Sequence, residues 1–382
     1  MTIHLRGMTW NHTRGYAPMV ATSEAFATEH PEVAITWEKR SLQAFADHPL
    51  DELAARYDLV VIDHPHVGMV AEAGCLVALD QAGHDAELAA LSAESLGRSH
   101  ESYQWKGHQW GLAIDAAAQV SAYRPDLLDE APTTWPQVIE LARAGRVLWP
   151  IKPVDSLMCF YTLCANLGSP CATGDALCDP AVAREALAQM QALASCVPRD
   201  CLAMNPIETL DRMSAADNDR IAYCPLLYGY TNYARDGYRP RRVRFTNIPA
   251  VGDAGPRGSA LGGTGIAVSA RCQHAELAVR YAFTIAAADC QKSLYFDAGG
   301  QPGNAEAWDD DRCNDVTAGF FRDTRETLDR SYMRPRHDGY MTFQDRGGDR
   351  VNAFLANGGD VDQAIDDLKS LYQDSYKLGL NQ

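Results

Sequence analysis

The sequence lacks a membrane-spanning stretch, a visible signal peptide and an excess of basic residues. It contains no apolar run approaching the roughly 20 residues that a membrane-spanning helix needs. Its N-terminus shows no basic segment followed by an apolar stretch, so no signal peptide is visible. Basic residues are scarcer than acidic ones, and the formal charge of −16 opposes binding to phosphate backbones and anionic membranes. We therefore expect neither nucleic-acid binding nor membrane insertion.

The cysteines show no regular spacing that would indicate a disulfide framework. There are eleven, an odd number, and they are scattered along the chain, as is typical of reduced thiols in a cytosol. Cys171 with Cys178, and Cys196 with Cys201, are the alternative pairs for an oxidising compartment. Together with the missing signal, this pattern predicts a cytoplasmic protein, with the periplasm as the alternative if a signal has been removed.

The composition that is present describes an ordinary folded protein. The 382 residues are 46% hydrophobic and 22% charged, and a chain of this length has room for two lobes with separate cores. Apolar patterning in the first hundred residues alternates between strands and helices, at 3–8, 18–28, 33–37, 50–55 and 59–62. This alternation predicts a doubly wound α/β lobe.

A second lobe is predicted to begin near Ile114. Thr134 is expected to cap a helix that Gly145 stops, and residues 261–268 read as a glycine-rich turn that feeds a strand. The other expected elements are a strand at 147–149, helices at 157–167, 180–195 and 205–216, a strand at 221–227 and a terminal helix at 361–372. The second lobe is therefore also of α/β type.

Between the first strand and the first helix lies a stretch rich in side chains that recognise polar or ring-shaped molecules. Ligands of open α/β sheets bind beyond the carboxyl ends of strands, where this stretch is predicted to form a loop. Each residue also has a structural interpretation: Trp10 in the core, Arg14 in a surface ion pair, His12 in a structural role. The candidate ligand-binding residues here are Trp10, Asn11, His12, Arg14 and Tyr16.

A second candidate cluster follows the strand at 59–62. Asp63, His64 and His66 come at its carboxyl end, where they are expected to hydrogen-bond a ligand or cap the next helix. A metal site is the weaker alternative, because Pro65 fixes the backbone between the histidines and no further ligand set is recognisable. Asp115, near the first crossover, is either a hydroxyl acceptor or a hinge residue without ligand contact.

The second lobe supplies aromatic candidates. Tyr228 and Tyr230 follow a predicted strand and, with Tyr233, are expected to stack on or hydrogen-bond an organic ligand. Clustered tyrosines can also bind iron, but no acidic partner accompanies them, so we expect no metal. Trp149 ends another predicted strand and is either a ligand-stacking or a packed residue.

Two glycine- or arginine-rich segments complete the candidate site. Gly263 and Thr264 lie in a motif followed by a strand, which is no dinucleotide fingerprint but can present backbone amides to a ligand. Arg334 and Arg336 are candidates to clamp an anionic group, or else belong to solvated ion pairs. Cys159 and Cys164 lie on an apolar predicted helix, which argues for inert thiols, and we expect neither catalytic residues nor a cofactor.

Several segments in order resemble the extracellular solute-binding proteins of family 1, the sugar-type receptors of ABC importers. The matching segments are Phe26 with His30-Pro31-Glu32-Val33, then 57–63, 134–138, 262–269 and 334–336. The resemblance implies an α/β protein with the periplasmic-binding-protein fold. In that fold, two lobes are joined by a hinge and a ligand is bound in the cleft between them.

The resemblance also implies how the chain divides and what it does. A first lobe of residues 1–113 plus about 260–310 and a second of 114–259 plus about 311–382 are expected, with hinge crossovers near 114 and 260. We expect a monomeric binder that closes on a small polar metabolite such as a sugar or sugar acid, with an ABC permease as partner if exported. Relatives of this fold include enzymes, so a cytoplasmic lyase, hydrolase or transferase that uses His12, His64 or a cysteine is the alternative.

Overall fold

A computed structural model describes residues 2–40, 50–173 and 176–378 of the chain. These residues divide into two compact units, one of 1–116 with 262–313 and one of 117–261 with 314–382. Two strands carry the chain from one unit to the other, β6 (Leu112–Tyr123) and β9 (Leu261–Val268). Both units mix strands and helices, as the α/β patterning of the sequence predicts.

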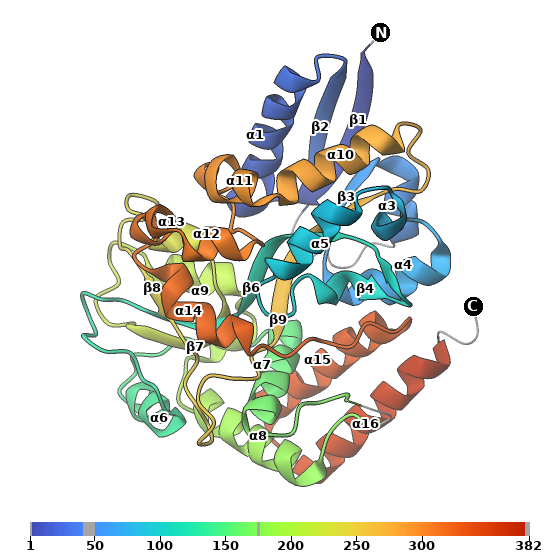
Figure 1. The fold of residues 1–382 in the computed structure, drawn as a ribbon. Coiled ribbons are helices and arrows are strands. Elements are labelled where there is room, and N and C mark those ends of the chain that lie inside the picture. The colour runs from blue at the N-terminus through green and yellow to red at the C-terminus, as the bar shows by residue number, and fades with distance from the viewer. Residues whose placement is uncertain (1, 41–49, 174–175, 379–382) are drawn as a thin grey trace. The chain divides into compact units, whose positions relative to one another are not determined.

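Unit 1 is built around a mixed sheet of parallel and antiparallel strands. β1 (Ile3–Trp10) pairs in parallel with β2 (Val33–Arg40) and with β3 (Leu59–Ile62), and β3 pairs antiparallel with β9. Figure 1 shows α1 (Thr13–Glu29) lying along β1 and β2. The continuous apolar run of β3 is fully buried, because sheet neighbours flank it and helices cover it.

The remaining elements of unit 1 are short. The α-helices are α3 (Leu50–Arg56), α4 (Val67–Ala73), α5 (Asp85–Ala93), α10 (Ala275–Ala286), α11 (Ala288–Cys290), α12 (Ala305–Asp309) and α13 (Asp311–Val316), the last running past the unit's end. Single turns and a small hairpin complete it: η1 (His64–His66), η2 (Leu79–Gln81), η3 (Glu101–Tyr103), η6 (Gln291–Tyr295), β4 (Gln104–Trp105) and β5 (His108–Gln109). The core of unit 1 forms where α1 and α10 bury their apolar faces against the strands.

Unit 2 combines an antiparallel sheet with a group of packed helices. The latter half of β6 pairs with β7 (Tyr223–Tyr228) and β8 (Arg244–Thr246). The helices and turns are α6 (Trp135–Arg143), α7 (Pro153–Asn166), α8 (Pro180–Ala194), η4 (Arg199–Leu202), α9 (Pro206–Met213), η5 (Thr231–Ala234), α14 (Phe320–Asp329), α15 (Tyr340–Asn357) and α16 (Val361–Leu378). In Figure 1, α15 and α16 lie beside α7 and α8.

α7 is the central helix of unit 2. All its residues from Asp155 to Asn166 are buried, so it is surrounded rather than amphipathic. Gly348 on α15 allows the close approach of these two helices, because a Cβ there would lie 2.6 Å from the carbonyl oxygen of Pro153. The helices α15, α8 and α16 thus extend the core around α7.

The ends of several predicted elements are shifted by a few residues in the structure, and three further differences concern the type of an element or the site. Residues 147–149 form no strand, only an isolated bridge from Val147 to Tyr223. The segment 261–268, expected to begin as a turn, is strand throughout: β9 pairs with β3 from Gly265 to Val268 and has β6 as its other neighbour in the sheet. The first helix begins at Thr13 and not at Pro18, and this last difference bears on the site.

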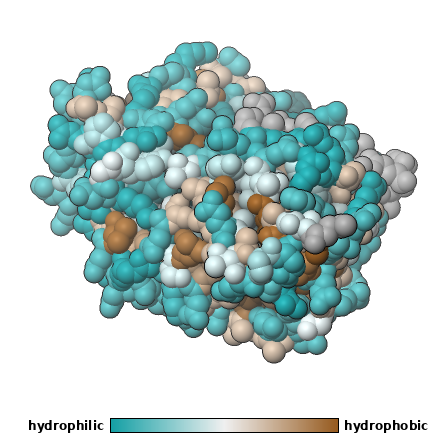
Figure 2. All heavy atoms as spheres, turned by 90° about the horizontal axis from the view of Figure 1, so that it is seen from above, coloured by the Kyte–Doolittle hydropathy of each residue, from teal (hydrophilic) through white to brown (hydrophobic). Residues whose placement is uncertain are grey.

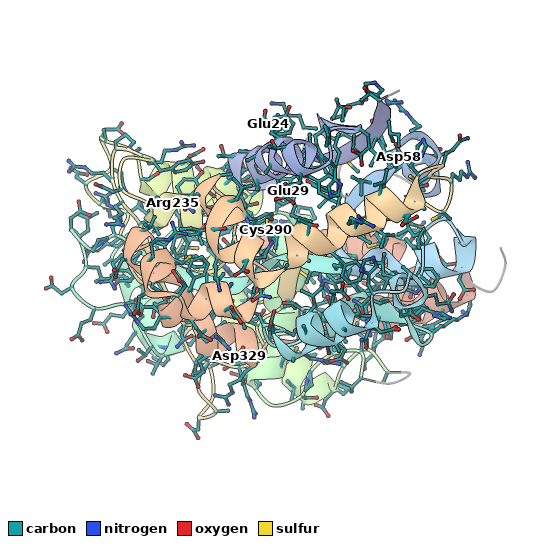
Figure 3. All side chains as sticks on the ribbon, turned by 45° about the horizontal axis from the view of Figure 1, so that its top comes forward. Glu24, Glu29, Asp58, Arg235, Cys290 and Asp329 are labelled. Carbon is teal, nitrogen blue, oxygen red and sulfur yellow. The ribbon has the colours of Figure 1, made fainter. Side chains whose placement is uncertain are left out.

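The exposed surface is polar with few large apolar side chains. On the face shown in Figure 2, hydrophilic residues dominate and hydrophobic ones appear as small separate patches. Among the described residues, the large hydrophobic side chains that are exposed are Val316 and Tyr376. Figure 3 marks two exposed acidic side chains of α1, Glu24 and Glu29. No helix among the described residues has the length and apolarity to cross a bilayer.

Candidate functional site

Three groups of predicted site residues meet at one edge of the unit 1 sheet. Trp10 ends β1 and Ile62 ends β3, and these strands are parallel neighbours, so both groups of residues that follow them leave at the same edge. β9 runs antiparallel to β3 with Gly265 opposite Ile62, so Gly263 and Thr264 come just before that point. The sheet topology therefore brings together three segments that are far apart in the sequence.

The stretch at 9–16 is not the loop that the sequence predicts. Only Asn11 and His12 connect β1 to α1, because His12 acts as the helix N-cap: its Nδ1 accepts a hydrogen bond from the backbone N–H of Arg14 at 3.0 Å. This cap starts the helix at Thr13, and Pro18 lies inside its second turn. Arg14 and Tyr16 therefore project from a helix, whose backbone fixes their directions.

Trp10 packs against the first turn of α1. Its side chain is 4% exposed, and a Cβ added to Gly15 would lie 2.3 Å from the indole ring. The hydroxyl of Thr9 donates to the carbonyl oxygen of Gly15 at 3.0 Å and holds the same turn. Gly15 is therefore required for Trp10 to sit where it does. A contact between Trp10 and a ligand stays a prediction.

Arg14 and Asp115 form a buried ion pair. The Nε and an Nη of Arg14 donate to the two carboxylate oxygens of Asp115 at 2.6 and 2.5 Å, and the side chains are 4% and 0% exposed. Burial raises the pKa of Asp115, and the guanidinium of Arg14 opposes that shift. Such bidentate pairing leaves both groups committed largely to each other.

Asp115 also lies beside the chain that returns through unit 1. It forms an isolated bridge with Pro302, and the N–H of Gly303 donates to Ile114 at 3.1 Å. The side-chain amide of Gln301 donates to the carbonyl oxygen of Ala116 at 2.8 Å, at the last residue of this part of unit 1. The ion pair thus fastens the first turn of α1 to the start of a strand that leaves the unit.

The histidines that follow β3 are buried. His64 is 0% and His66 5% exposed, and both lie in the turn η1, which leads directly into α4. The Nδ1 of His64 lies 3.3 Å from a carboxylate oxygen of Asp63, and its ring meets Tyr103 edge-on with 6.4 Å between centroids. Asp63 remains the more exposed member, with 26% of its side chain accessible.

Thr264 offers a hydrogen-bonding group at the same edge. Its hydroxyl is buried, and the described residues provide it with no hydrogen-bond partner. A buried hydroxyl without a partner is costly, so a bound molecule or water is expected to complete it. Gly263, with φ of +94°, has a backbone conformation that favours glycine.

In unit 2 the tyrosines at the end of β7 and just after it fall into two groups. Tyr233 is structural: its hydroxyl donates to Asp211 at 2.8 Å, and the guanidinium of Arg239 lies 5.3 Å above its ring. Tyr228 is half-buried and Tyr230 is 6% exposed. The sequence predicts both as ligand-binding residues, and for both this stays a prediction.

The other predicted residues of unit 2 are mostly held by the protein. Trp149 is fully buried and meets Trp135 edge-on, with 6.3 Å between ring centroids. Arg334 is 4% exposed and donates to the carbonyl oxygen of Leu261 at 3.2 Å and to Gln344 at 3.0 Å. Arg336 is half-buried. Ligand contacts by these residues stay predictions.

One candidate that sequence reasoning missed is Asp155, in the first turn of α7. It is 4% exposed, and one of its carboxylate oxygens has no hydrogen-bond partner among the described residues. Burial raises its pKa to about 7, while Lys152 opposes the shift and Glu208 adds to it. Buried carboxyl groups with raised pKa concentrate at functional sites. The available signal was a lone acid at the start of an otherwise apolar helix.

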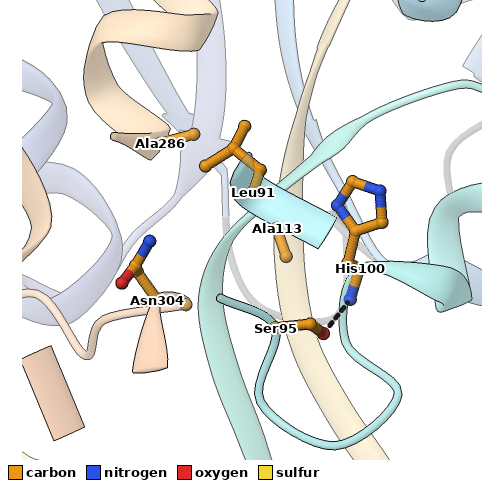
Figure 4. A pocket seen from close by; sticks show the side chains of 7 residues that line it. Leu91, Ser95, His100, Ala113, Ala286 and Asn304 are labelled. Atoms are coloured by element: carbon orange, nitrogen blue, oxygen red, sulfur yellow. Dashed lines mark hydrogen bonds between the residues drawn. The ribbon is translucent and has the colours of Figure 1, made fainter. Parts of the chain in front are cut away.

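A small pocket lies elsewhere in unit 1, between α5 and the segment before α12. Figure 4 shows its lining by Leu91, Ser95, His100, Ala113, Ala286, Gly303 and Asn304. The hydroxyl of Ser95 accepts a hydrogen bond from the backbone N–H of His100 at 3.1 Å, and burial lowers the pKa of His100 to about 4. The pocket has room for about one water molecule, so it is no site for a metabolite.

An α/β chain of two units, with polar and aromatic side chains gathered where strands end, has the architecture of a periplasmic-type solute-binding protein. The sequence matches the profile of the bacterial extracellular solute-binding proteins over residues 21–321, and the chain belongs to that family. None of the proteins with a curated function matches it in sequence.

Solved structures share the fold at low sequence identity. Maltose-bound MalE3 of T. maritima is 18% identical, with a TM-score of 0.82 and coverage of 98% of this chain and 99% of that one. A solute-binding protein of Thermotoga lettingae bound to α-D-tagatose is 14% identical, with a TM-score of 0.82 over 98% and 100%. One of Agrobacterium radiobacter in complex with ribitol is 19% identical, with a TM-score of 0.75 over 97% and 98%.

Proposed function

We propose that this protein is the solute receptor of an ABC importer and that its ligand is a sugar or a polyol. The observation that carries the proposal is the family match over residues 21–321. The ligands named for proteins of the same fold, maltose, tagatose and ribitol, support the choice of ligand class. All three are uncharged, and many hydroxyl groups make them partners for buried hydrogen-bonding groups.

The residues of each unit are chemically suited to such a ligand. Polyhydroxylated molecules need fixed acceptors and donors together with apolar faces. In unit 1 the hydrogen-bonding groups are the carboxylate of Asp63 and the buried hydroxyl of Thr264. In unit 2 the hydrogen-bonding group is the carboxylate oxygen of Asp155 that has no partner among the described residues. Tyr228 and Tyr230 supply aromatic faces. We propose these five as ligand-binding residues.

The enzyme alternative is not supported by the side chains on which it depended. His12 uses its Nδ1 to cap α1, and His64 is fully buried. Burial raises the pKa of several thiols, the opposite of what an activated nucleophile requires: Cys159, Cys171, Cys178, Cys201, Cys224, Cys272, Cys290 and Cys313. These features favour a binding protein.

A thermal-shift and calorimetry panel tests the proposal. The full chain, unfolded and refolded to remove any ligand carried through purification, is titrated with maltose, tagatose, ribitol and matched sugar acids. A ligand at a hundred times its Kd adds about 2.7 kcal/mol to the free energy of unfolding, which raises the melting temperature by several degrees. The absence of any shift or heat across the panel would refute the ligand class, and product formation would restore the enzyme alternative.

Variants of the full chain locate the site. Asp155→Asn and Thr264→Val are expected to weaken binding, because each removes a buried group proposed to hydrogen-bond the solute. Glu24→Gln, on the exposed side of α1, is the matched control and is expected to bind as the parent does. Unchanged affinity in both site variants would mean that the ligand is held elsewhere.

Compartment, partner and closure are separate proposals. The sequence predicts the cytoplasm, with the periplasm as alternative, and the extracellular character of the family favours the alternative. We therefore propose an extracytoplasmic receptor that works with an ABC permease, which cell fractionation and co-purification with the importer test. That the lobes close on the ligand, and that the protein is a monomer, stay predictions for small-angle scattering with and without solute.

A further inference from the structure

The carboxyl group of Asp155 is buried in the first turn of α7 without a full set of partners. The residue is 4% exposed, and one of its carboxylate oxygens is completely enclosed with no hydrogen-bond partner among the described residues. Burying a carboxylate in this state costs several kcal/mol, roughly, because the group loses its hydration and gains nothing in return. A partner from outside the chain is therefore expected to complete it.

The position of Asp155 in its helix offers a structural role that the side chain does not perform. An acid at the third helical residue can accept from the N–H of the N-cap residue, as Glu208 does from Asn205 at 2.8 Å at the start of α9. At the start of α7 the N-cap is Lys152, and its N–H donates instead to the carbonyl oxygen of Met204 at 3.4 Å. The carboxyl group of Asp155 is thus left available for another partner.

The charges of the proposed ligand-binding residues indicate the sign of that partner. The acids among those residues are Asp63 in unit 1 and Asp155 in unit 2, and the set contains no arginine or lysine. The guanidinium of Arg14, in unit 1, already pairs with the carboxylate of Asp115. The formal charge of −16 on the whole chain adds a field that attracts cations. This balance favours a positive charge on the ligand and opposes a sugar acid.

We propose that the ligand is an amino sugar or an aminated polyol whose ammonium group binds the carboxylate of Asp155. This inference rests on the proposed function, because it narrows the sugars and polyols to those that carry a protonated amine. An ammonium group has three N–H donors, and its hydrogen bonds to a carboxylate are roughly twice as strong as those between neutral groups. A neutral hydroxyl at the same place would leave the buried charge without a counter-charge.

The groups around Asp155 determine how this binding depends on pH. Lys152 lowers the pKa of Asp155 and Glu208 on α9 raises it, but burial is the largest cause and brings it to about 7. The thiols of Cys159, one turn further along α7, and of Cys224 on β7 stay protonated, since burial raises their pKa values. The carboxyl group must therefore lose its proton before it pairs with an ammonium group. Affinity for an amino sugar should fall up to about tenfold per pH unit below pH 7.

Matched sugars test the charge directly. The full chain, unfolded and refolded to remove any bound ligand, is titrated calorimetrically at about pH 7 with glucose, glucosamine, N-acetylglucosamine and glucuronate, and with the corresponding galactose series. N-acetylation keeps the nitrogen but removes its charge. In at least one series the free amine is expected to bind at least about tenfold more tightly than the neutral, acetylated and acidic forms, as one charge-assisted hydrogen bond provides.

A variant and a change of pH assign the preference to Asp155. Asp155→Asn is expected to bind the amine at least about tenfold more weakly and to lose the preference over the acetylated sugar. Asp367→Asn removes one carboxylate from the same unit, where Arg350 pairs with it, and is expected to keep the preference. Lowering the pH to about 5 should remove the preference in the parent protein, so the test does not depend on whether a variant folds.

The outcomes separate this inference from the proposed function. Neutral or acidic sugars that bind as tightly as the amine would overturn the inference and leave a sugar receptor standing. A preference for the amine that persists in Asp155→Asn would overturn the role of Asp155. If no sugar or polyol of any charge bound, the proposed function would fail and the inference with it.

Discussion

Replacing Asp155 with asparagine removes a buried carboxyl group while keeping its shape, and the effect on stability should depend on pH in a defined direction. Burial raises the pKa of Asp155 from an ordinary value of 3.8 to about 7 in the folded protein. Between these two values the folded state holds a proton that the unfolded state has lost. The free energy of unfolding therefore falls as the pH rises from about 4 to about 7, and the loss is complete above pH 7.

The size of the effect follows from the separation of the two pKa values of Asp155. At 1.36 kcal/mol per pH unit, the gap corresponds to about 4 kcal/mol of lost stability above pH 7. Asparagine does not titrate, so Asp155→Asn avoids this loss. Any contribution of the new amide itself is the same at every pH. The stability of the variant relative to the parent should therefore rise by about 2 to 3 kcal/mol between pH 5 and pH 8.

Urea unfolding followed by tryptophan fluorescence measures this difference, since Trp135 and Trp149 both lie in unit 2. Asp367→Asn is the control in the same unit: hydrogen bonds from Arg350 and Gln363 lower the pKa of Asp367, so its effect should be constant over this pH range. Parallel stability curves for the parent and Asp155→Asn would show that Asp155 is hydrated or paired in the folded protein, which would refute the reasoning.

Three further substitutions have defined expectations. On an exposed helix, Gly15→Ala would raise the free energy of unfolding by up to about 1 kcal/mol. Here it should lower that free energy, measured by urea unfolding, by about 1 to 3 kcal/mol, because the methyl group collides with Trp10. A stabilised variant would contradict the packing. Arg14→Met should lower the free energy of unfolding by about 3 to 5 kcal/mol, because it leaves the carboxylate of Asp115 buried without its partner. A double-mutant cycle with Asp115→Asn should show strong coupling, and additive losses of stability would contradict the ion pair. Asn205→Ala should lower the free energy of unfolding by about 1 kcal/mol, because the Asn205 side chain accepts a hydrogen bond from the backbone N–H of Glu208 at the start of α9. Calorimetry measures the change, and an unchanged stability would contradict the role of this cap.

Local sequence patterns determined most elements of the fold. The apolar run at 59–62 is strand β3 with the expected bounds, and the signals at Thr134 and at Asn205 with Pro206 mark the starts of α6 and α9. These predictions succeed because apolar periodicity and helix caps act between residues close in sequence. The ordered motifs between Phe26 and Arg336 likewise predicted the family, which the profile match confirms.

Tertiary structure decided which polar groups face each other. From the sequence, Arg14 and Asp115 are only separate candidates, because they lie far apart along the chain. In the folded protein their side chains form a buried ion pair. A histidine cap moved the start of α1 to Thr13, against the signal of Pro18. Burial, which depends on every neighbouring element, gives Asp155 its raised pKa. Local pattern fixes where helices and strands form, whereas desolvation and pairing of charges arise only when distant segments pack.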